Sequence, residues 1–244
     1  MTDQNDQELP RRLALAEIHL DLLFVRNASG LLLQSRDSEV RAPLLHVVRT
    51  PEGNRWYLGE ALPQRLRDDL DAALRRAPAI DDGRLIAGDL SPPSDVLRLL
   101  MNFHQELNES RGPAFDFPEA LPAAGLATEI LTEPHATASV AELAWLRDAT
   151  ADARPFAVAR NERGEVVAVC HSARSTASAA EAGVETASTY RGRGFAGAVV
   201  SRWAEAVRAE GRVPIYSTQW TNHASRAVAR KLGLVAFGED YSIG

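Results

Sequence analysis

Hydrophobic side chains recur every three or four residues in several segments of the chain, a spacing that predicts amphipathic helices. The clearest is the segment 63–76, in which arginine and aspartate separate Leu66, Leu70 and Leu74. The segment 195–210 has the same periodicity and ends before a glycine, the residue that commonly caps a helix. The predicted helices span residues 11–26, 63–76, 96–107, 140–146, 195–210 and 222–232.

Short runs of β-branched and aliphatic residues between turn-forming residues predict strands. Residues 156–159 and 166–170 are expected to pair as a hairpin across the turn 161–164, whereas the small and polar residues 173–180 are interpreted as a loop. Strands and helices that follow one another without repeated βαβ units indicate an α+β or mixed α/β fold. Further strands are predicted at residues 31–33, 44–48, 56–58, 183–186, 213–217 and 234–241.

An alanine- and proline-rich stretch at residues 118–126 predicts a boundary between two domains. The chain has 244 residues, enough for two modest domains or one large one. We therefore predict a smaller α/β domain at residues 1–125, whose role the sequence leaves open, and a second domain at residues 126–244.

The segment 183–197 combines a strand, a glycine-rich loop and the start of a helix. Free backbone N–H groups and the positive end of the helix dipole favour a bound anion at such a junction. Gly192 and Gly194 let the backbone come close to a ligand. Arg191 and Arg193 add positive charge and forked donors that suit phosphate oxygens.

One interpretation of this junction is a dinucleotide site. Gly192, Gly194 and Gly197 have the spacing of the G-x-G-x-x-G fingerprint. That fingerprint also requires an acidic residue at the end of the next strand, and residues 217–219 contain none. A nucleotide-dependent oxidoreductase is therefore the weaker hypothesis, which a fluorescence titration with NADH would test.

A second interpretation rests on a resemblance. Arg191-x-x-Gly194-x-Ala196, preceded by Tyr190, resembles the pyrophosphate loop of the GNAT superfamily of acyl-CoA-dependent N-acetyltransferases. The resemblance covers about residues 155–244. Within the superfamily, the motifs also resemble those of a bacterial subgroup that contains antibiotic-resistance acetyltransferases. The other motifs that carry it are Glu185-Thr186, Pro214-Ile215-Tyr216-Ser217, Asn222-x-x-Ser225, Ala229-Arg230-Lys231-Leu232-Gly233 and Leu234.

The resemblance implies a GNAT-like splayed mixed sheet in the C-terminal half, with acetyl-CoA as co-substrate. The pantetheine arm would lie along the strand before the loop, where unpaired N–H groups can hold the acetyl carbonyl. Because this half alone is short for the fold, either its first elements are trimmed or the N-terminal half completes the sheet. The residues expected to contact acetyl-CoA are Val184, Thr186, Arg191, Gly192, Arg193, Gly194, Phe195, Ala196, Asn222 and Ser225.

Acetyl transfer requires a neutral amine, although an alkyl ammonium has a pKa of about 10.4. Glu185, just before the loop, is the carboxylate best placed to remove that proton or to contact the substrate. Glu181 is a weaker candidate. The alternative for Glu185 is a structural role, on an exposed strand face or in a pair with an arginine such as Arg174.

The leaving thiolate needs a proton, and the sequence offers more than one donor. Many GNAT members have a tyrosine four residues beyond the serine, where this chain has Ala229. Tyr216 or Ser225 can donate instead, although Tyr216 also suits the core of its strand. The remaining alternatives are that the thiolate leaves through water or that the chain binds acyl-CoA without turnover.

Composition restricts the function classes further. The formal net charge of −6 argues against a nucleic-acid partner. No apolar run reaches membrane length and the polar start is no signal peptide, so a cytoplasmic location is expected. Cys170 is the single cysteine, interpreted as a buried hydrophobe, and the histidines lack ligand spacing, so we predict no metal.

The sequence thus favours an enzyme that moves an acetyl group from acetyl-CoA to a primary amine of a small molecule, by direct attack through a tetrahedral intermediate. The net negative charge of the chain favours cationic amines as substrates. The sequence does not decide whether the chain forms a homodimer. The alternative is an acyl-CoA-binding sensor or partner module without turnover, which a thiol-release assay over a panel of amines would distinguish.

Overall fold

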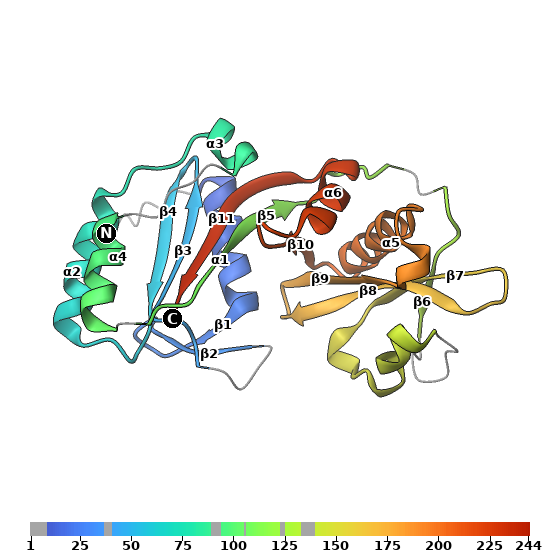
Figure 1. Ribbon diagram of the computed structural model, residues 1–244, viewed down its shortest axis with the longest axis horizontal. Helices are drawn as coiled ribbons and strands as arrows, with labels where there is room; N and C mark the ends of the chain where they lie inside the picture. Colours follow the sequence, from blue (N-terminus) through green and yellow to red (C-terminus); the bar gives the residue numbers. More distant parts are fainter. Residues whose placement is uncertain (1–8, 37–40, 89–93, 105, 123–124, 133–139) are drawn as a thin grey trace, which may run out of the picture.

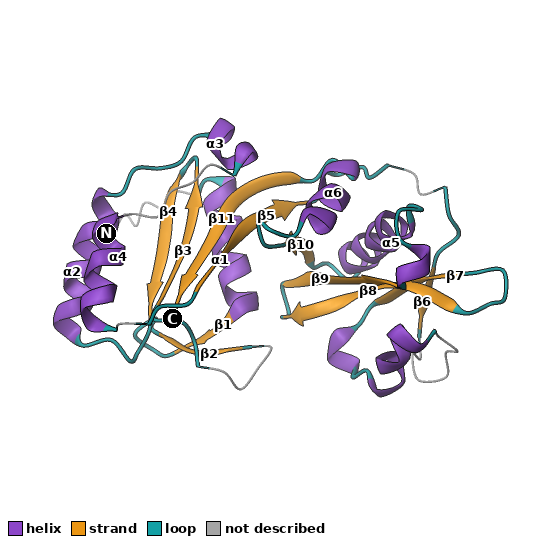
Figure 2. Cartoon of the chain, in the orientation of Figure 1, coloured by secondary structure: helices purple, strands orange, loops and turns teal. Residues whose placement is uncertain are grey.

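A long mixed sheet runs through the computed structural model, which describes residues 9–36, 41–88, 94–104, 106–122, 125–132 and 140–244. The sheet has nine strands in the order β4-β3-β11-β5-β10-β9-β8-β7-β6 (Figures 1 and 2). Neighbours are antiparallel except for β9 and β10, which are parallel. The strands are β3 (Leu45–Thr50), β4 (Gly53–Leu58), β5 (Glu109–Asp116), β6 (Glu129–Leu131), β7 (Phe156–Arg160), β8 (Val166–Ser175), β9 (Ala179–Thr186), β10 (Val213–Ser217) and β11 (Val235–Ile243). A separate ribbon pairs β1 (Phe24–Arg26) with β2 (Leu32–Ser35).

Helices cover both faces of this sheet. In its N-terminal part, α1 packs on one face, and α2 and α4 pack on the other. In its C-terminal part, α5 and α6 cover one face and the 3₁₀ helix η2 covers the opposite one. The helices are α1 (Arg11–Leu23), α2 (Gln64–Arg76), α3 (Asp82–Ala87), α4 (Ser94–Phe103), η2 (Ala141–Asp148), η3 (Ala151–Ala153), η4 (Ser188–Tyr190), α5 (Phe195–Ala209) and α6 (His223–Lys231). The mixed α+β architecture predicted from the sequence is confirmed.

The N-terminal half completes the sheet of the C-terminal half. Strand β5 lies between β10 and β11 and pairs antiparallel with both. Strand β11 in turn pairs with β3 on its other side. Of the two alternatives that the sequence left open, the structure therefore has the second. The division into residues 1–125 and 126–244 stays a prediction.

Strands β9 and β10 run side by side only at their beginnings. Their ladder joins Val213 with Ala179 and ends where Ile215 faces Glu181. Beyond that point β10 continues against β5, whereas β9 pairs, among the described strands, with β8 alone. Residues 182–186 of β9 therefore have one edge open, as the resemblance implied for this strand.

The prediction of a loop at residues 173–180 is wrong. Strand β8 extends to Ser175 and β9 begins at Ala179, so a tight turn joins them. Ala179 and Ala180 are fully buried because α1 and α5 pack on the two faces of the sheet here. Small side chains suit a strand that is covered by a helix on each face. Because these small residues are only weakly hydrophobic, the sequence pattern indicated a loop instead of a strand.

Three predicted helices also end differently. The first stops at Leu23, and the residues predicted as its last turn form β1. The segment expected as a helix at 96–107 is helical only to Phe103, and residue 105 lies outside the described residues. The segment predicted at 140–146 is a 3₁₀ helix.

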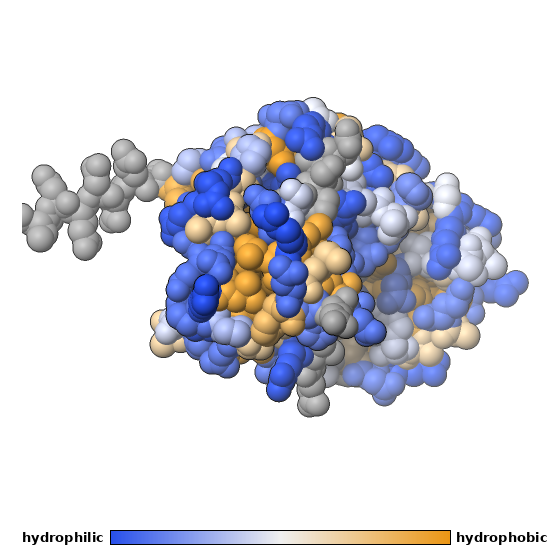
Figure 3. All heavy atoms as spheres, turned by 60° about the vertical axis from the view of Figure 1, so that its left-hand side comes forward, coloured by the Kyte–Doolittle hydropathy of each residue, from blue (hydrophilic) through white to orange (hydrophobic). Residues whose placement is uncertain are grey.

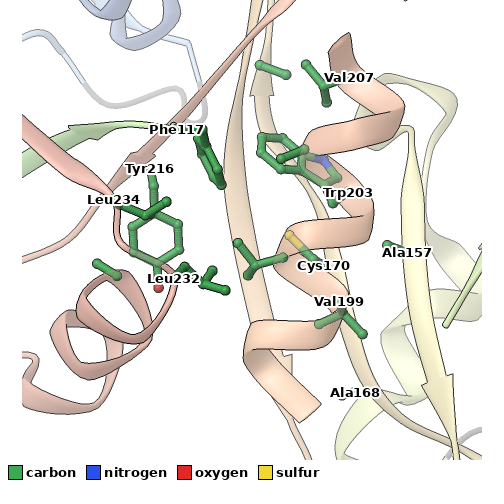
Figure 4. Close-up of a cluster of buried hydrophobic side chains, with 14 of the residues drawn as sticks. Phe117, Ala157, Ala168, Cys170, Val199, Trp203, Val207, Tyr216, Leu232 and Leu234 are labelled. Carbon is green, nitrogen blue, oxygen red and sulfur yellow. The ribbon is translucent and has the colours of Figure 1, made fainter. Parts of the chain in front are cut away.

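Two hydrophobic regions stand out. The core under α5 holds Trp203, Phe117 and Tyr216, with Cys170 among them (Figure 4). On the side of α2 and α4, hydrophobic atoms are visible between hydrophilic side chains (Figure 3). There Met101 and Phe103 of α4 are 59% and 42% exposed.

Candidate active site

A cavity of about 910 Å³ opens where β9 separates from β10. Its walls come from the open part of β9, the loop after it, the first turns of α5, one side of α6, and η2. All the residues predicted to contact acetyl-CoA line it, and so does Glu185. The sequence therefore identified residues that the fold brings together at one cavity.

The loop at the start of α5 adopts the geometry of an anion-binding site. Gly192 and Gly194 have φ angles of 76° and 91°, the left-handed region that favours glycine. Gly194 is the N-cap residue, and no side chain caps the helix, so its first N–H groups stay available. These donors and the helix dipole suit a phosphate.

Aromatic and polar contacts hold the two arginines of the loop. Arg191 donates from Nε to the carbonyl of Thr186 at 3.1 Å. The guanidinium of Arg193 lies 5.2 Å from the ring centroid of Tyr190. Lys231, the last residue of α6, brings a third positive charge to the cavity. The sequence motifs contain this lysine, but its role as a cavity cation was not predicted.

The α6 side of the cavity begins with a capped helix. Asn222 Oδ1 accepts a hydrogen bond from the N–H of Ser225 at 3.0 Å, which is the expected N-cap contact. Ser225 Oγ is 2.7 Å from the hydroxyl of Tyr216. Tyr216 does not line the cavity: it is buried in the core, and burial raises its pKa to about 12. Ala229 is also fully buried in this core, so that position faces away from the cavity.

Glu185 lies on the other side of β9 and is exposed. Its Oε2 accepts a hydrogen bond from Trp145 Nε1 of η2 at 3.1 Å. The suggested pair with Arg174 is wrong, because Arg174 instead contacts Glu181 at 2.6 Å. Burial by itself would raise the pKa of Glu181, but the hydrogen bond and charge of His19, with those of Arg174, lower it to about 2. Glu181 is thus ionised and poorly basic.

Two hydroxyl groups of the cavity lack a partner in the part of the chain that is described. They are Oγ1 of Thr186 and Oγ of Ser201, a residue of α5 that is only 5% exposed. A buried hydroxyl without a hydrogen bond is costly, so both groups indicate a polar ligand. Ser201 was not predicted as a site residue, and neither was Glu142 of η2, because no motif links them to the loop.

Other candidate chemistry is less prominent. Cys170 is buried in the core, and burial raises the pKa of its thiol, so it is no activated nucleophile. Among the described residues, no three histidine, cysteine, aspartate or glutamate side chains are grouped to hold a metal. Within those same residues, no helix combines the length and apolarity needed to cross a bilayer.

Comparison with known proteins gives a match in the C-terminal part. Residues 151–243 match the model of the GNAT acetyltransferase family. A search of curated proteins found no match.

Several solved structures are similar to the chain. A GCN5-related N-acetyltransferase from Kribbella flavida is 14% identical with a TM-score of 0.49, over 97% of this chain and 96% of that one. A GCN5-related N-acetyltransferase-like protein from Streptococcus suis is 15% identical with a TM-score of 0.45, over 83% and 85%. A GNAT-family protein from Novosphingobium aromaticivorans is 20% identical with a TM-score of 0.43, over 56% of this chain and 64% of that one. The resemblance to the GNAT acetyltransferases is confirmed for residues 151–243, the segment that carries β9, the loop, α5 and α6.

Proposed function

We propose that the chain transfers an acetyl group from acetyl-CoA to the primary amine of a small molecule. The observation that carries this proposal is a single cavity that joins the anion-binding loop, the open edge of β9 and the carboxylate of Glu185. The match of residues 151–243 to the GNAT acetyltransferase family supports acetyl transfer as the reaction.

The residues of the cavity fit acetyl-CoA as co-substrate. The diphosphate would bind the free N–H groups at the start of α5, with Arg191, Arg193 and Lys231 as counter-charges. The pantetheine arm would lie along residues 182–186, whose free edge offers main-chain hydrogen bonds. The unpartnered hydroxyl of Ser201 supports a polar ligand in the same cavity.

The reaction would use the residues around the open strand in three roles. Glu185 accepts a proton from the incoming ammonium, and the neutral amine nitrogen attacks the thioester carbonyl. A free N–H of β9 stabilises the negative oxygen of the tetrahedral intermediate. When the carbon–sulfur bond breaks, the thiolate takes a proton from the Ser225 hydroxyl while that hydroxyl accepts the proton released by the attacking nitrogen, so the serine stays neutral. Tyr216 supports this hydroxyl from behind at 2.7 Å. Tyr216 keeps its own proton at neutral pH because burial raises its pKa to about 12.

A second candidate is an acyl-CoA-binding module without turnover. It is favoured by the burial of Ala229 and Tyr216, since neither position presents an acid directly to the cavity. Both candidates require acetyl-CoA binding, so they differ only in the release of free thiol.

The binding test compares two glycines with similar backbone angles. Gly194→Ala places a side chain at a φ of 91° in the proposed diphosphate site, whereas Gly164→Ala does so at 77° in the hairpin turn. Each change costs about 1 kcal/mol of stability through backbone strain. By calorimetry, we expect only Gly194→Ala to weaken acetyl-CoA binding, by roughly tenfold or more. No binding by the unmodified chain, or equal effects of the two changes, would contradict the proposal.

The turnover test measures thiol release over a panel of primary amines. We expect turnover that falls roughly a hundredfold in Glu185→Gln while acetyl-CoA affinity is retained. Tyr216→Phe should lower kcat through the loss of the hydroxyl behind Ser225. Tight acetyl-CoA binding with no amine-dependent thiol release would favour the binding module.

A further inference from the structure

The two sides of the open strand lead into different surroundings. Ala182 and Val184 pack toward the core under α5. Glu185 has the opposite orientation and contacts Trp145 of η2. Successive side chains of a strand alternate between its faces, so the cavity is reached from both faces of the sheet along this edge. The proposed co-substrate would occupy the α5 and α6 side, which leaves the η2 side for the acceptor.

The wall formed by η2 has a negative charge at two places. Glu185 accepts from Trp145 Nε1. Three residues after Glu185, the N–H of Ser188 donates at 3.1 Å to Oε1 of Glu142, which is three residues before Trp145. Helix η2 therefore runs beside the end of β9 and places both carboxylates along the cavity. Contacts with Ser188, and less strongly the charge of Arg191, lower the pKa of Glu142.

Aromatic rings lie next to these carboxylates. The indole of Trp145 packs edge-on to the ring of His171 with 4.8 Å between centroids, and His171 stacks on Phe156. Burial lowers the pKa of His171 to about 4, so its ring is neutral and adds no positive charge to this wall. Trp145 is not among the residues that line the cavity, so its part here is to hold the Glu185 carboxylate through the Nε1 hydrogen bond.

The unpartnered hydroxyls of Thr186 and Ser201 lie on the α5 side of the cavity, which the proposed co-substrate would occupy. The positive charges of Arg191, Arg193 and Lys231 would be compensated by the phosphates of a bound co-substrate. Of the charged side chains that line the cavity, Glu142 and Glu185 are the two that would not face a phosphate.

From this arrangement we infer that the acceptor is an amine with a second positive charge. Its reacting nitrogen faces Glu185 and the β9 edge, and its distal ammonium or guanidinium contacts Glu142. Glu142 is thus a specificity-determining residue. This inference rests on the proposed function, because it places the acceptor on the side of the strand that acetyl-CoA leaves open.

The test compares putrescine with n-pentylamine, which has the same chain but a methyl group in place of the second ammonium. We measure thiol release at saturating acetyl-CoA and expect kcat/KM for putrescine to be higher by roughly tenfold. Agmatine should behave like putrescine because its distal group is a guanidinium. A similar kcat/KM for putrescine and n-pentylamine, or a preference for n-pentylamine, would overturn the inference but leave the proposed acetyl transfer intact.

A variant then locates the second charge. Glu142→Gln should raise KM for putrescine by roughly five- to tenfold, with kcat and KM for n-pentylamine unchanged. Asp148→Asn is the matched control, because Asp148 is an exposed carboxylate of η2 outside the cavity. An equal effect of Glu142→Gln on both amines would contradict the assignment.

Amine binding is also measured by calorimetry in the presence of CoA, so the result does not depend on turnover. Putrescine should bind more tightly than n-pentylamine, and its affinity should fall with added salt. If acetyl-CoA binds but putrescine does not, the inference is wrong. If acetyl-CoA itself does not bind, the proposed function fails first.

Discussion

At the point where β9 leaves β10, the residue Glu181 is buried among charged side chains. Its carboxylate contacts Arg174 at 2.6 Å, His19 at 3.4 Å and the hydroxyl of Ser217. The other ring nitrogen of His19 lies 3.1 Å from Asp240. Burial alone would lower the pKa of His19, but the two carboxylates raise it to about 10. The network joins α1, β8, β9, β10 and β11 where the sheet begins to splay.

We expect His19→Gln to lower the free energy of unfolding by roughly 3 kcal/mol, because it leaves two buried carboxylates without their shared cation. Glu181 has a lowered pKa, so its contribution is present above the unfolded value of 4.5 and is lost as the pH falls toward 2. His19 has a raised pKa, so its contribution is present below 6.5 and is lost as the pH rises through 10.

Urea denaturation between about pH 3 and 9 checks this prediction. The difference between the unmodified chain and His19→Gln should be largest near pH 5 to 6 and should shrink toward both ends. His104→Gln is the control, since His104 is exposed. A difference independent of pH would mean that the histidine contributes packing and not charge.

At the scale of elements, β5 supports the cavity from behind. The loop after β10 is tied to β5 by hydrogen bonds from the N–H of Thr218 and of Trp220 to its carbonyl oxygens. A Cβ atom on Gly112 would lie 1.8 Å from the carbonyl oxygen of Thr218 and 2.7 Å from the Cα of Gln219. The contact is between main chains, so neither side can move away by a rotamer change.

Gly112→Ala should therefore cost roughly 3 kcal/mol of stability and weaken acetyl-CoA binding, because the displaced loop leads directly to Asn222. Gly197→Ala is the comparison: its Cβ would lie 3.6 Å from Leu232, an ordinary contact, and the residue is within α5. Denaturation in urea measures the first effect and calorimetry the second. If Gly112→Ala proved as stable as Gly197→Ala, β5 would not hold this loop closely.

Helices and strands with a regular hydrophobic spacing were predictable from the sequence, and so was the glycine-rich loop at the start of α5. Helix α5 and strand β10 match their predicted positions because their apolar spacing and glycine cap are local signals. The strand residues within 173–180 were wrongly predicted as a loop, because packing of helices on both faces, a long-range property, decides that small residues form strands there. The η2 wall with Glu142 and Trp145 was missed for the same reason. Only the fold brings it to β9.

On the scale of the whole molecule, the predicted division at residues 118–126 meets a continuous sheet. Strand β11 pairs with β5 and β3, which both belong to the N-terminal half. Without residues 1–125, β11 would lose both partners, and the buried side chains of Phe237, Tyr241 and Ile243 would lose their cover. The edge of β10 toward β5 would be exposed as well.

We therefore expect residues 126–244 expressed alone to unfold without a cooperative transition and to bind no acetyl-CoA. Circular dichroism during urea denaturation and calorimetry would measure both properties. As a control, a full-length chain cut between residues 125 and 126 after folding should stay associated and keep its affinity, because the cut leaves every strand pair in place. A cooperative, acetyl-CoA-binding fragment 126–244 would instead show that this half is an independent domain, with β5 as an addition to a sheet that is already stable.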